Sequence, residues 1–463
     1  MVIRSLPALP SPPPAERIEA LASELEDLGP LRQGAELRRL SQDFHSYSPV
    51  LEPLLADRSA QLAVRAGTLE QVRRVASACA RHGVPLTLRG SGTGNYGQCV
   101  PLAGGVVLDL SGLRQLRHLD PESGVLTAEA GCTLADLDRE LSARGRSLRL
   151  APSTWRTASL GGFVAGGAGG IGSLRWGFLR DVGNLLGLEV MTVEPEPRLL
   201  RLEAGASAAL NHAYGTNGIL TALTLPTCAA VPWWEVVAGF PSWPAALAAL
   251  QALGDTALLL NNAALLEAPV AAHMPWPADC PAPGPGEQRL LLLAAPDSLP
   301  LLPAWLAERG GTLRWQARQH GGRGMPLREL CWNHTTLHWR GSHPDWTYLQ
   351  VLLPADPAPV LEALRRRWGE TLLWHLEAVR QQGGLRLSGL PLLRFQGRER
   401  LEDLIGHCRD LGILVFDPHE ISVEDGGMGQ VEPDQVAAKA SHDPAGLLNP
   451  GKLRGWLERL PPP

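Results

Sequence analysis

The stretch RGSGTGNYGQ, residues 89–98, contains a Gly-x-Gly-x-x-Gly pattern directly after the probable strand VPLTL. Several glycines close together let consecutive backbone N–H groups converge on one anion, and nearby Ser, Thr and Asn side chains add donors. Arg89 can add a charge-assisted hydrogen bond to a phosphate. The pattern therefore indicates either a phosphate-binding loop or a hairpin turn that uses glycine only for its positive φ.

A Rossmann dinucleotide site needs a helix immediately after its glycines, because the pyrophosphate binds at the N-terminus of that helix. Here the next residues are QCVPLAGGVVLDL, in which Pro101, Gly104 and Gly105 prevent a second helical turn. We therefore expect a loop that runs from one strand to the next.

The densest polar cluster is CWNHTTLHWRGSHPDWTYLQ, residues 331–350. His334 and His338 would share one face of a helix, as in H-E-x-x-H zinc sites, but no glutamate follows His334. HTTLHW also alternates well enough for a strand, which would place both histidines on one side too. A catalytic, a structural and a metal-binding histidine all stay open, and we expect no bound metal.

Short β-rich runs and glycine turns alternate from about Leu62 to Pro226 and must position the glycine loop. We expect a helix from Leu69 that Thr68 caps and Gly83 ends, and a second helix that begins at Thr133. The segment after residue 228 is rich in Leu, Ala and Trp and reads as a separate α+β domain.

Composition excludes several classes of protein. The net charge is −5 and no basic run contains interleaved aromatics, so we expect no nucleic acid partner. The seven cysteines lack C-x-x-C spacing, which is typical of reduced thiols in a cytoplasmic protein. No run of about 18 apolar residues occurs, so we expect no transmembrane segment, while peripheral membrane attachment stays open.

Three further segments follow the glycine loop in order: PSTWRTASLGGFVAGGAGG, GTNGILT and DPAGLLNPGKL. With the loop they resemble the FAD-binding oxidoreductases of the vanillyl-alcohol oxidase and p-cresol methylhydroxylase type. These FAD-linked oxidases include the glycolate and D-lactate dehydrogenases. The resemblance implies an α+β protein: a two-subdomain FAD-binding (PCMH-type) fold with an α+β substrate or cap domain built on an antiparallel sheet.

Expected boundaries follow from the resemblance. An N-terminal arm and helix would span residues 1–55, the FAD-binding domain 56–228, the substrate domain 229–417, and a segment that returns to the FAD domain 418–463. The resemblance also implies the cofactor-binding residues, which are Arg89, Gly90, Ser91, Gly92, Thr93, Gly94 and Asn95 for the pyrophosphate, Pro152, Ser153, Thr154, Ser159, Gly161 and Gly162 for the flavin side, Gly218, Ile219 and Leu220 for the adenine side, and Asn449 and Lys452.

Many relatives bind flavin covalently through the histidine of an Arg-x-Gly-Gly-His loop. Thr93 stands at that position here, and threonine has no imidazole nitrogen to alkylate. We therefore predict non-covalent FAD.

On the substrate side, a flavin that oxidises an alcohol needs a base for the hydroxyl proton and, for acids, a cation for the carboxylate. His334, His419 and Glu424 are the candidates for proton transfer, and Arg340 is the candidate for the carboxylate. The Glu-His-Gly motif of the hydroxyacid dehydrogenases has Asp425 in place of its histidine, and their Gly-His-x-Gly-Asp-Gly-Asn-x-His stretch is missing.

The sequence thus predicts an FAD-dependent oxidoreductase that oxidises a small alcohol or a glycolate-like or lactate-like 2-hydroxyacid by hydride transfer to flavin N5. An FAD-linked sugar or lactone oxidoreductase, and a flavin-binding accessory subunit without turnover, are the alternatives. Oxygen, a quinone and a protein carrier all stay open as electron acceptor.

Overall fold

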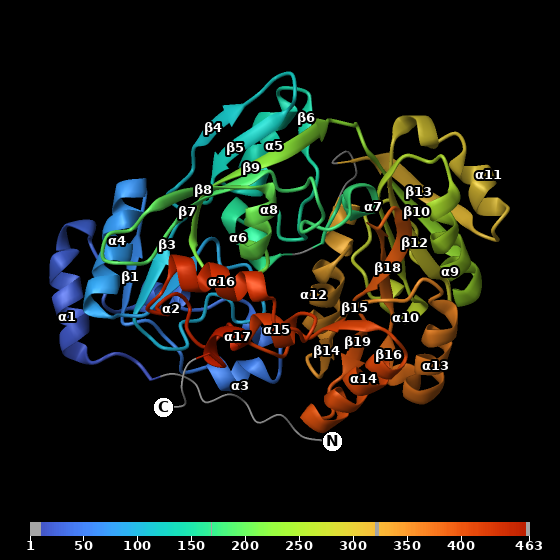
Figure 1. The fold of residues 1–463 in the computed structure, drawn as a ribbon. Coiled ribbons are helices and arrows are strands. Elements are labelled where there is room, and N and C mark those ends of the chain that lie inside the picture. Colours follow the sequence, from blue (N-terminus) through green and yellow to red (C-terminus); the bar gives the residue numbers. More distant parts are fainter. Residues whose placement is uncertain (1–10, 168, 320–323, 460–463) are drawn as a thin grey trace.

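The computed structural model describes residues 11–167, 169–319 and 324–459 and shows two lobes side by side (Figure 1). The first lobe contains the N-terminal half of the chain together with the C-terminal segment, and the second lobe contains the middle of the chain. Helices and antiparallel sheets occur in both lobes, which confirms the expected α+β class.

A small parallel sheet lies near the N-terminal end of the first lobe. Its strands lie in the order β1 (Leu62–Arg65), β3 (Val106–Asp109) and β2 (Leu86–Arg89). Helix α4 (Leu69–His82) connects β1 to β2 and begins at Thr68, whose Oγ1 accepts a hydrogen bond from the Gln71 N–H at 3.2 Å. Gly83 ends this helix with a φ of 61°. Both predicted ends of α4 are confirmed.

A larger antiparallel sheet forms the rest of the first lobe. Its strands are β4 (Leu116–Leu119), β5 (Val125–Glu129), β9 (Ile219–Ala229), β7 (Gly187–Met191) and β8 (Leu199–Glu203), in that order, with β6 (Arg146–Leu148) on the end of β9. Helices α5 (Leu134–Ser142) and α6 (Leu160–Gly166) bury their apolar side chains against it. Thr133 caps α5 as predicted.

An eight-stranded antiparallel sheet forms the second lobe. Its strands lie in the order β13 (Thr312–Arg318), β10 (Trp234–Phe240), β12 (Gln288–Ala294), β11 (Leu260–Leu266), β17 (His375–Gln381), β18 (Gly384–Gly389), β15 (Gln350–Leu352) and β20 (Leu414–Phe416). Both faces are buried, which explains continuous apolar runs such as LLLLA in β12.

One face of this sheet is covered by helices, namely α9 (Trp243–Ala252), α11 (Leu302–Ala307), α13 (Ala358–Trp368) and α14 (Arg398–Asp410). The other face is turned toward the first lobe, since Ile171 and Phe178 of the first lobe pack into its apolar cluster. On that face lie α10 (Ala268–Ala271), α12 (Asn333–Ser342) and the small sheet of β14 (Trp346–Tyr348), β19 (Leu392–Arg394) and β16 (Leu372–Leu373).

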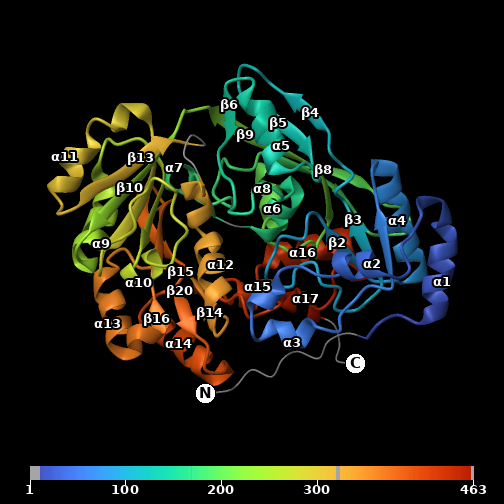
Figure 2. The ribbon, with the colours of Figure 1, turned by 180° about the vertical axis from the view of Figure 1, so that it is seen from behind.

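HTTLHW is therefore helical and not extended, and α12 stands where the two lobes meet (Figure 2). The reader can find α12 in Figures 1 and 2 as the helix of the second lobe on the side of α15 (Val423–Gly426) and α6. The polar cluster predicted from sequence is thus placed at the junction of the lobes.

The described N-terminal and C-terminal segments, from residue 11 and up to residue 459, pack on the first lobe. The N-terminal residues form α1 (Ala15–Glu24), α2 (Ala35–Leu40), α3 (Leu51–Leu55) and the 3₁₀ turns η1 (Glu26–Leu28) and η2 (His45–Tyr47). The C-terminal residues form α15, α16 (Pro433–His442) and α17 (Arg454–Leu457).

The remaining short elements are α7 (Ser173–Trp176), α8 (Ala204–Ser207), η3 (Ala208–Leu210), η4 (Leu253–Asp255), η5 (Pro296–Ser298), η6 (Leu327–Leu330) and η7 (Gly369–Thr371). Among the helices of the described residues, none has both the length and the apolar character that crossing a bilayer requires.

Candidate functional site

The loop after β2 runs without a helix to β3, as the sequence predicts. Gly92 and Gly97 have φ values of 69° and 70°, which favour glycine. At Gly90 a Cβ would lie 2.0 Å from Ser159 Oγ, so the loop backbone directly touches the start of α6. The loop therefore leaves its N–H groups close to a second glycine segment.

That second segment begins with a capped helix. Ser159 Oγ accepts a hydrogen bond from the Gly162 N–H at 3.3 Å, and the Gly161 N–H donates to the Ala130 carbonyl at 2.8 Å. A Cβ at Gly161 would lie 2.7 Å from Ala130 Cβ, so only glycine allows this packing. The loop segment of Pro152, Ser153 and Thr154 precedes it, held by the pairing of its neighbour Ala151 with Ile171.

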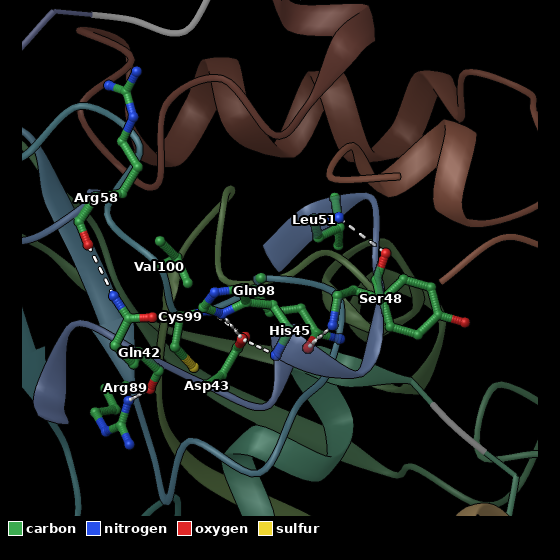
Figure 3. A network of polar contacts seen from close by, with 12 residues as sticks. Gln42, Asp43, His45, Ser48, Leu51, Arg58, Arg89, Gln98, Cys99 and Val100 are labelled. Carbon is green, nitrogen blue, oxygen red and sulfur yellow. Dashed lines mark hydrogen bonds and ion pairs between the residues drawn. The ribbon is translucent and has the colours of Figure 1, made fainter. Parts of the chain in front are cut away.

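Arg89 supports the glycine loop from inside. Its buried guanidinium donates hydrogen bonds to the carbonyls of Leu40, at 3.1 Å, and of Gln42. Asp43, the next residue, accepts from the Cys99 N–H at 3.2 Å and from the His45 N–H at 3.0 Å (Figure 3). These hydrogen bonds attach the N-terminal segment to both ends of the glycine loop.

Lys452 holds the same loop from the C-terminal side. Its buried ammonium group donates to the carbonyls of Gly97, Gln98 and Val100 at 2.7, 2.8 and 2.7 Å. Burial lowers the pKa of Lys452 to about 8. Since the three N–H donors are used within the protein, Lys452 orients the glycine loop through its backbone carbonyls.

Asn449, like Lys452, contacts the glycine loop from the C-terminal segment. Its Nδ2 donates to the carbonyls of Gln98 at 2.9 Å and Tyr214 at 2.7 Å, while its buried Oδ1 has no partner. Gly218 lies directly before Ile219 and Leu220, the first residues of β9, and a Cβ on Gly218 would lie 2.5 Å from Val190.

His334 is the proton-transfer candidate whose surroundings suit that role. It is the second residue of α12, and its Nδ1 lies 2.7 Å from Glu329 Oε2. The other oxygen of Glu329 accepts a hydrogen bond from Arg156 Nε of the first lobe at 2.9 Å. The contact has an ion-pair distance without hydrogen-bond geometry, so Glu329 would act on a protonated ring through its charge and leaves Nε2 to exchange a proton.

His419 and Glu424 have structural partners instead. The Ser48 hydroxyl donates to His419 Nδ1 at 2.7 Å, and Nε2 donates to the Tyr348 carbonyl at 3.0 Å. Burial lowers the pKa of His419 to about 3, so it is neutral. The oxygens of Glu424 accept from the backbone N–H groups of the first two residues of α17 at 2.9 and 2.8 Å. Both side chains therefore hold parts of the fold together through these contacts.

Arg340 lies near the other end of α12, in half-buried surroundings. Its Nε donates to the Trp346 carbonyl at 2.8 Å, and its Cζ stands 5.3 Å from the ring centre of Tyr47. Neither Nη atom makes a hydrogen bond with any residue that the structure describes. Burial lowers the pKa of Arg340. A half-buried cation with free donors suits a carboxylate ligand.

Tyrosines gather at this end of α12. The Asn95 side-chain amide of the glycine loop donates to the Tyr348 hydroxyl, which joins the two lobes. Tyr96 and Tyr214 lie beside each other with ring centres 6.2 Å apart. The chain contains four tyrosines, and all four lie near the glycine loop, a convergence that no sequence pattern predicts.

The second lobe contains a buried polar network that no sequence pattern predicts. Glu377 accepts hydrogen bonds from the Trp332 N–H at 2.7 Å, from Asn262 Nδ2 at 3.1 Å and from His375 Nε2 at 2.7 Å. Trp332 has a φ of 54°, a strained value for a bulky residue. Its indole lies 2.9 Å from the position that a Cβ of Gly169 would take. Glu377 therefore holds Trp332 against the second glycine segment.

Within the described residues, no group of three or more His, Cys, Asp or Glu side chains is arranged to hold a metal ion. His338 donates instead from Nε2 to the Glu329 carbonyl at 2.9 Å, so it fixes the start of the helix beside His334.

Comparisons with known proteins identify the cofactor that this site binds. Residues 60–202 match the model of the family described as FAD binding domain. The glycolate oxidase subunit GlcD of Escherichia coli K12 is 25% identical over 441 residues, which cover 84% of this chain and 83% of that protein. The D-lactate dehydrogenase of Archaeoglobus fulgidus is 29% identical over 187 residues, 39% of this chain and 41% of its own.

Among solved structures, one of alkyldihydroxyacetonephosphate synthase superposes with a TM-score of 0.72 at 14% identity, over 98% of this chain and 88% of that one. The expected fold and the resemblance stated above are confirmed, and the cofactor is FAD. The residues fit this group, because the glycine loop and the start of α6 touch at Gly90 and Ser159, so that glycine-rich backbone from both segments lies together, as in an anion-binding nest.

We predict that Gly90→Ala prevents FAD binding, because the new methyl group would overlap Ser159 Oγ. The double variant Gly90→Ala, Ser159→Gly removes that oxygen and should regain part of the FAD. The measurement is the flavin to protein absorbance ratio after purification. Gly406→Ala is the control, since nothing lies within 4 Å of its Cβ. Full FAD content in Gly90→Ala would contradict the contact.

We also predict that the FAD is bound without a covalent bond through residue 93, because threonine stands there. Acid precipitation should leave a colourless polypeptide and a yellow supernatant. A peptide that keeps the flavin spectrum after proteolysis would contradict this.

Proposed function

We propose that this protein, an FAD-dependent oxidoreductase of the FAD-linked oxidase type, oxidises the CH–OH group of a small 2-hydroxyacid. Similarity to the glycolate oxidase subunit and to the D-lactate dehydrogenase supports this substrate class, as does similarity to a probable mitochondrial D-2-hydroxyglutarate dehydrogenase of rice, 30% identical over 38% of this chain. When bound, FAD supplies the acceptor for the hydride that leaves the substrate carbon.

The free guanidinium of Arg340 is the observation that carries the proposal. It lies at the junction of the lobes, next to the Tyr348 hydroxyl that Asn95 of the glycine loop contacts. A half-buried cation whose terminal donors have no partner among the described residues is placed to bind an anionic ligand. A substrate carboxylate would bind the two Nη atoms in a bidentate manner.

His334 would take the hydroxyl proton at Nε2. Glu329 would stabilise the resulting imidazolium through Nδ1, and Arg156 fixes Glu329 from the first lobe. The arrangement requires the two lobes to be in contact, because Arg156 comes from the first lobe, while Glu329 and His334 come from the second. Proton transfer by a positioned histidine contributes about 10² to 10⁴ in rate.

Features of the chain also favour a second candidate substrate. The hydroxyacid dehydrogenase stretch Gly-His-x-Gly-Asp-Gly-Asn-x-His is missing from the sequence, which favours a sugar or lactone as the alcohol. The proposed location is the cytoplasm. Oxygen, a quinone or a protein carrier would accept the electrons from the reduced flavin.

An anaerobic screen tests the substrate class. We expect bleaching of the visible flavin band with one or more 2-hydroxyacids, since Arg340 binds the carboxylate and the carbinol carbon is oxidised. Sugars, lactones and uncharged alcohols run in parallel. Bleaching only by uncharged alcohols would reject the acid, and a flavin that every compound leaves oxidised would indicate an accessory subunit.

We predict that His334→Asn slows anaerobic flavin reduction by about a hundredfold or more, because asparagine cannot accept the proton. Stopped-flow absorbance gives the rate. His118→Asn serves as the control, since His118 is an exposed side chain on β4, away from the junction. A reduction rate equal to that of the unaltered protein would remove His334 from the mechanism.

A further inference from the structure

Two buried side chains of the second lobe hold the residue that starts α12. Trp332 is the N-cap of this helix, and its backbone N–H donates to Glu377 Oε1 at 2.7 Å. Its indole Nε1 donates to Asn262 Oδ1 at 3.2 Å, and Asn262 Nδ2 donates to Glu377 Oε2 at 3.1 Å. The main chain and the side chain of Trp332 are thus held by Asn262 of β11 and Glu377 of β17, which we call the Asn262–Glu377 pair.

Chemistry fixes the direction of each hydrogen bond in this network. An indole nitrogen only donates, so the Asn262 atom that it contacts is the carbonyl oxygen, and the amide nitrogen faces Glu377. The Oε1 atom of Glu377 also accepts from His375 Nε2 at 2.7 Å. Glu377 and His375 are fully buried and Asn262 is 1% exposed, so bulk water does not replace a lost partner. The network therefore needs one carboxylate and one amide at the Asn262–Glu377 pair.

The backbone conformation of Trp332 depends on this support. Its φ of 54° and ψ of −142° lie in a region that residues other than glycine rarely occupy, and such a conformation persists only where the surroundings determine it. The Trp332 carbonyl accepts the Thr335 N–H at 3.1 Å and so begins the first turn of α12. His334 is the second residue of that helix. The Asn262–Glu377 pair therefore determines where the backbone of His334 lies.

Trp332 also contacts the first lobe. A Cβ on Gly169 of the second glycine segment would lie 2.9 Å from Cη2 at the tip of the Trp332 indole. Just beyond that segment, the Gly172 N–H donates to the carbonyl of Asn261, the neighbour of Asn262 on β11, at 3.1 Å. The backbone that follows α6 therefore meets β11 both directly and through Trp332.

We propose that Asn262 and Glu377 are positioning residues for the oxidation. They hold Trp332 in its strained conformation, and through it they set the distance between His334 and the second glycine segment, the expected flavin side of the site. Both act only through Trp332, because they are too deeply buried to touch a substrate. A misplacement of about 1 Å can cost about a hundredfold in rate. The inference rests on the proposed function, since it takes His334 as the base.

Exchanging the two functional groups tests the Asn262–Glu377 pair. Glu377→Gln turns an amide nitrogen toward the Asn262 amide, and Asn262→Asp brings two carboxylates together, so each single variant breaks a hydrogen bond. In the double variant Asn262→Asp, Glu377→Gln, the carboxylate at position 262 accepts from the indole and from the amide nitrogen at position 377. The amide oxygen there accepts from Trp332 and His375. Every hydrogen bond is then restored, with the charge on the other strand.

Hydrogen exchange of the FAD-loaded protein measures the contact between the lobes without turnover. Amides of residues 169–177 should exchange about tenfold faster or more in each single variant, because Trp332 no longer supports them, and at the original rate in the double variant. Amides of the glycine loop, residues 89–98, are the internal control, since Lys452 holds that loop from the C-terminal segment.

Flavin reduction by whichever compound bleaches the flavin in the anaerobic screen measures the chemical step. At saturating substrate its rate should fall by about tenfold to a hundredfold in each single variant. The double variant should recover to within about threefold of the unaltered protein. The half-saturating substrate concentration should change by less than about threefold in all three, because a positioning residue does not touch the substrate.

Gly169→Ala reaches the same contact from the first lobe and keeps the Asn262–Glu377 pair intact, so it serves where a single variant fails to fold. Its methyl group would displace the indole of Trp332 and should give the same faster exchange and slower reduction. Gly205→Ala is the matched control, since nothing lies within 4 Å of its Cβ.

Three results would overturn the inference: single variants that exchange and react like the unaltered protein, a double variant no better than the single ones, or recovery of exchange without recovery of the reduction rate. Failure of the proposed function gives a different result. In that case no 2-hydroxyacid reduces the flavin of the unaltered protein, and the exchange rates still decide whether the Asn262–Glu377 pair supports the second glycine segment.

Discussion

The buried ammonium group of Lys452 fixes the loop between β2 and β3, and the other parts of the site are arranged around that loop. Three carbonyls of the loop point to one cation, so the backbone there has a single conformation. Arg89 and Asp43 attach the N-terminal segment to the same loop, and Asn95 attaches the second lobe through Tyr348. Three other parts of the chain thus meet at one loop of irregular backbone.

Sequence reasoning succeeded where the signal is local. Thr68 and Gly83 determine the ends of α4 through hydrogen bonds and backbone conformation within a few residues, and Pro101 excludes a helix after the glycine loop. The order of four glycine-containing segments was enough for the fold and for FAD. These features depend on residue types and spacing, which the sequence contains in full.

Roles that depend on tertiary partners were less accessible. His419 and Glu424 have the residue types of a base, but Ser48 is 371 positions away from His419 and the partners of Glu424 are backbone N–H groups of α17. HTTLHW fits a helix and a strand equally well in the sequence, and only the structure shows that it belongs to α12. The partners of Trp332 come from β11 and β17.

The site also depends on the order in which the chain is made. The glycine loop, α6 and the second lobe all precede Lys452 in the sequence, so during synthesis they leave the ribosome before the cation that orients the loop. Until then the three carbonyls of the loop have no buried partner. The first lobe therefore cannot fix the conformation of its glycine loop until Lys452 has been added to the chain.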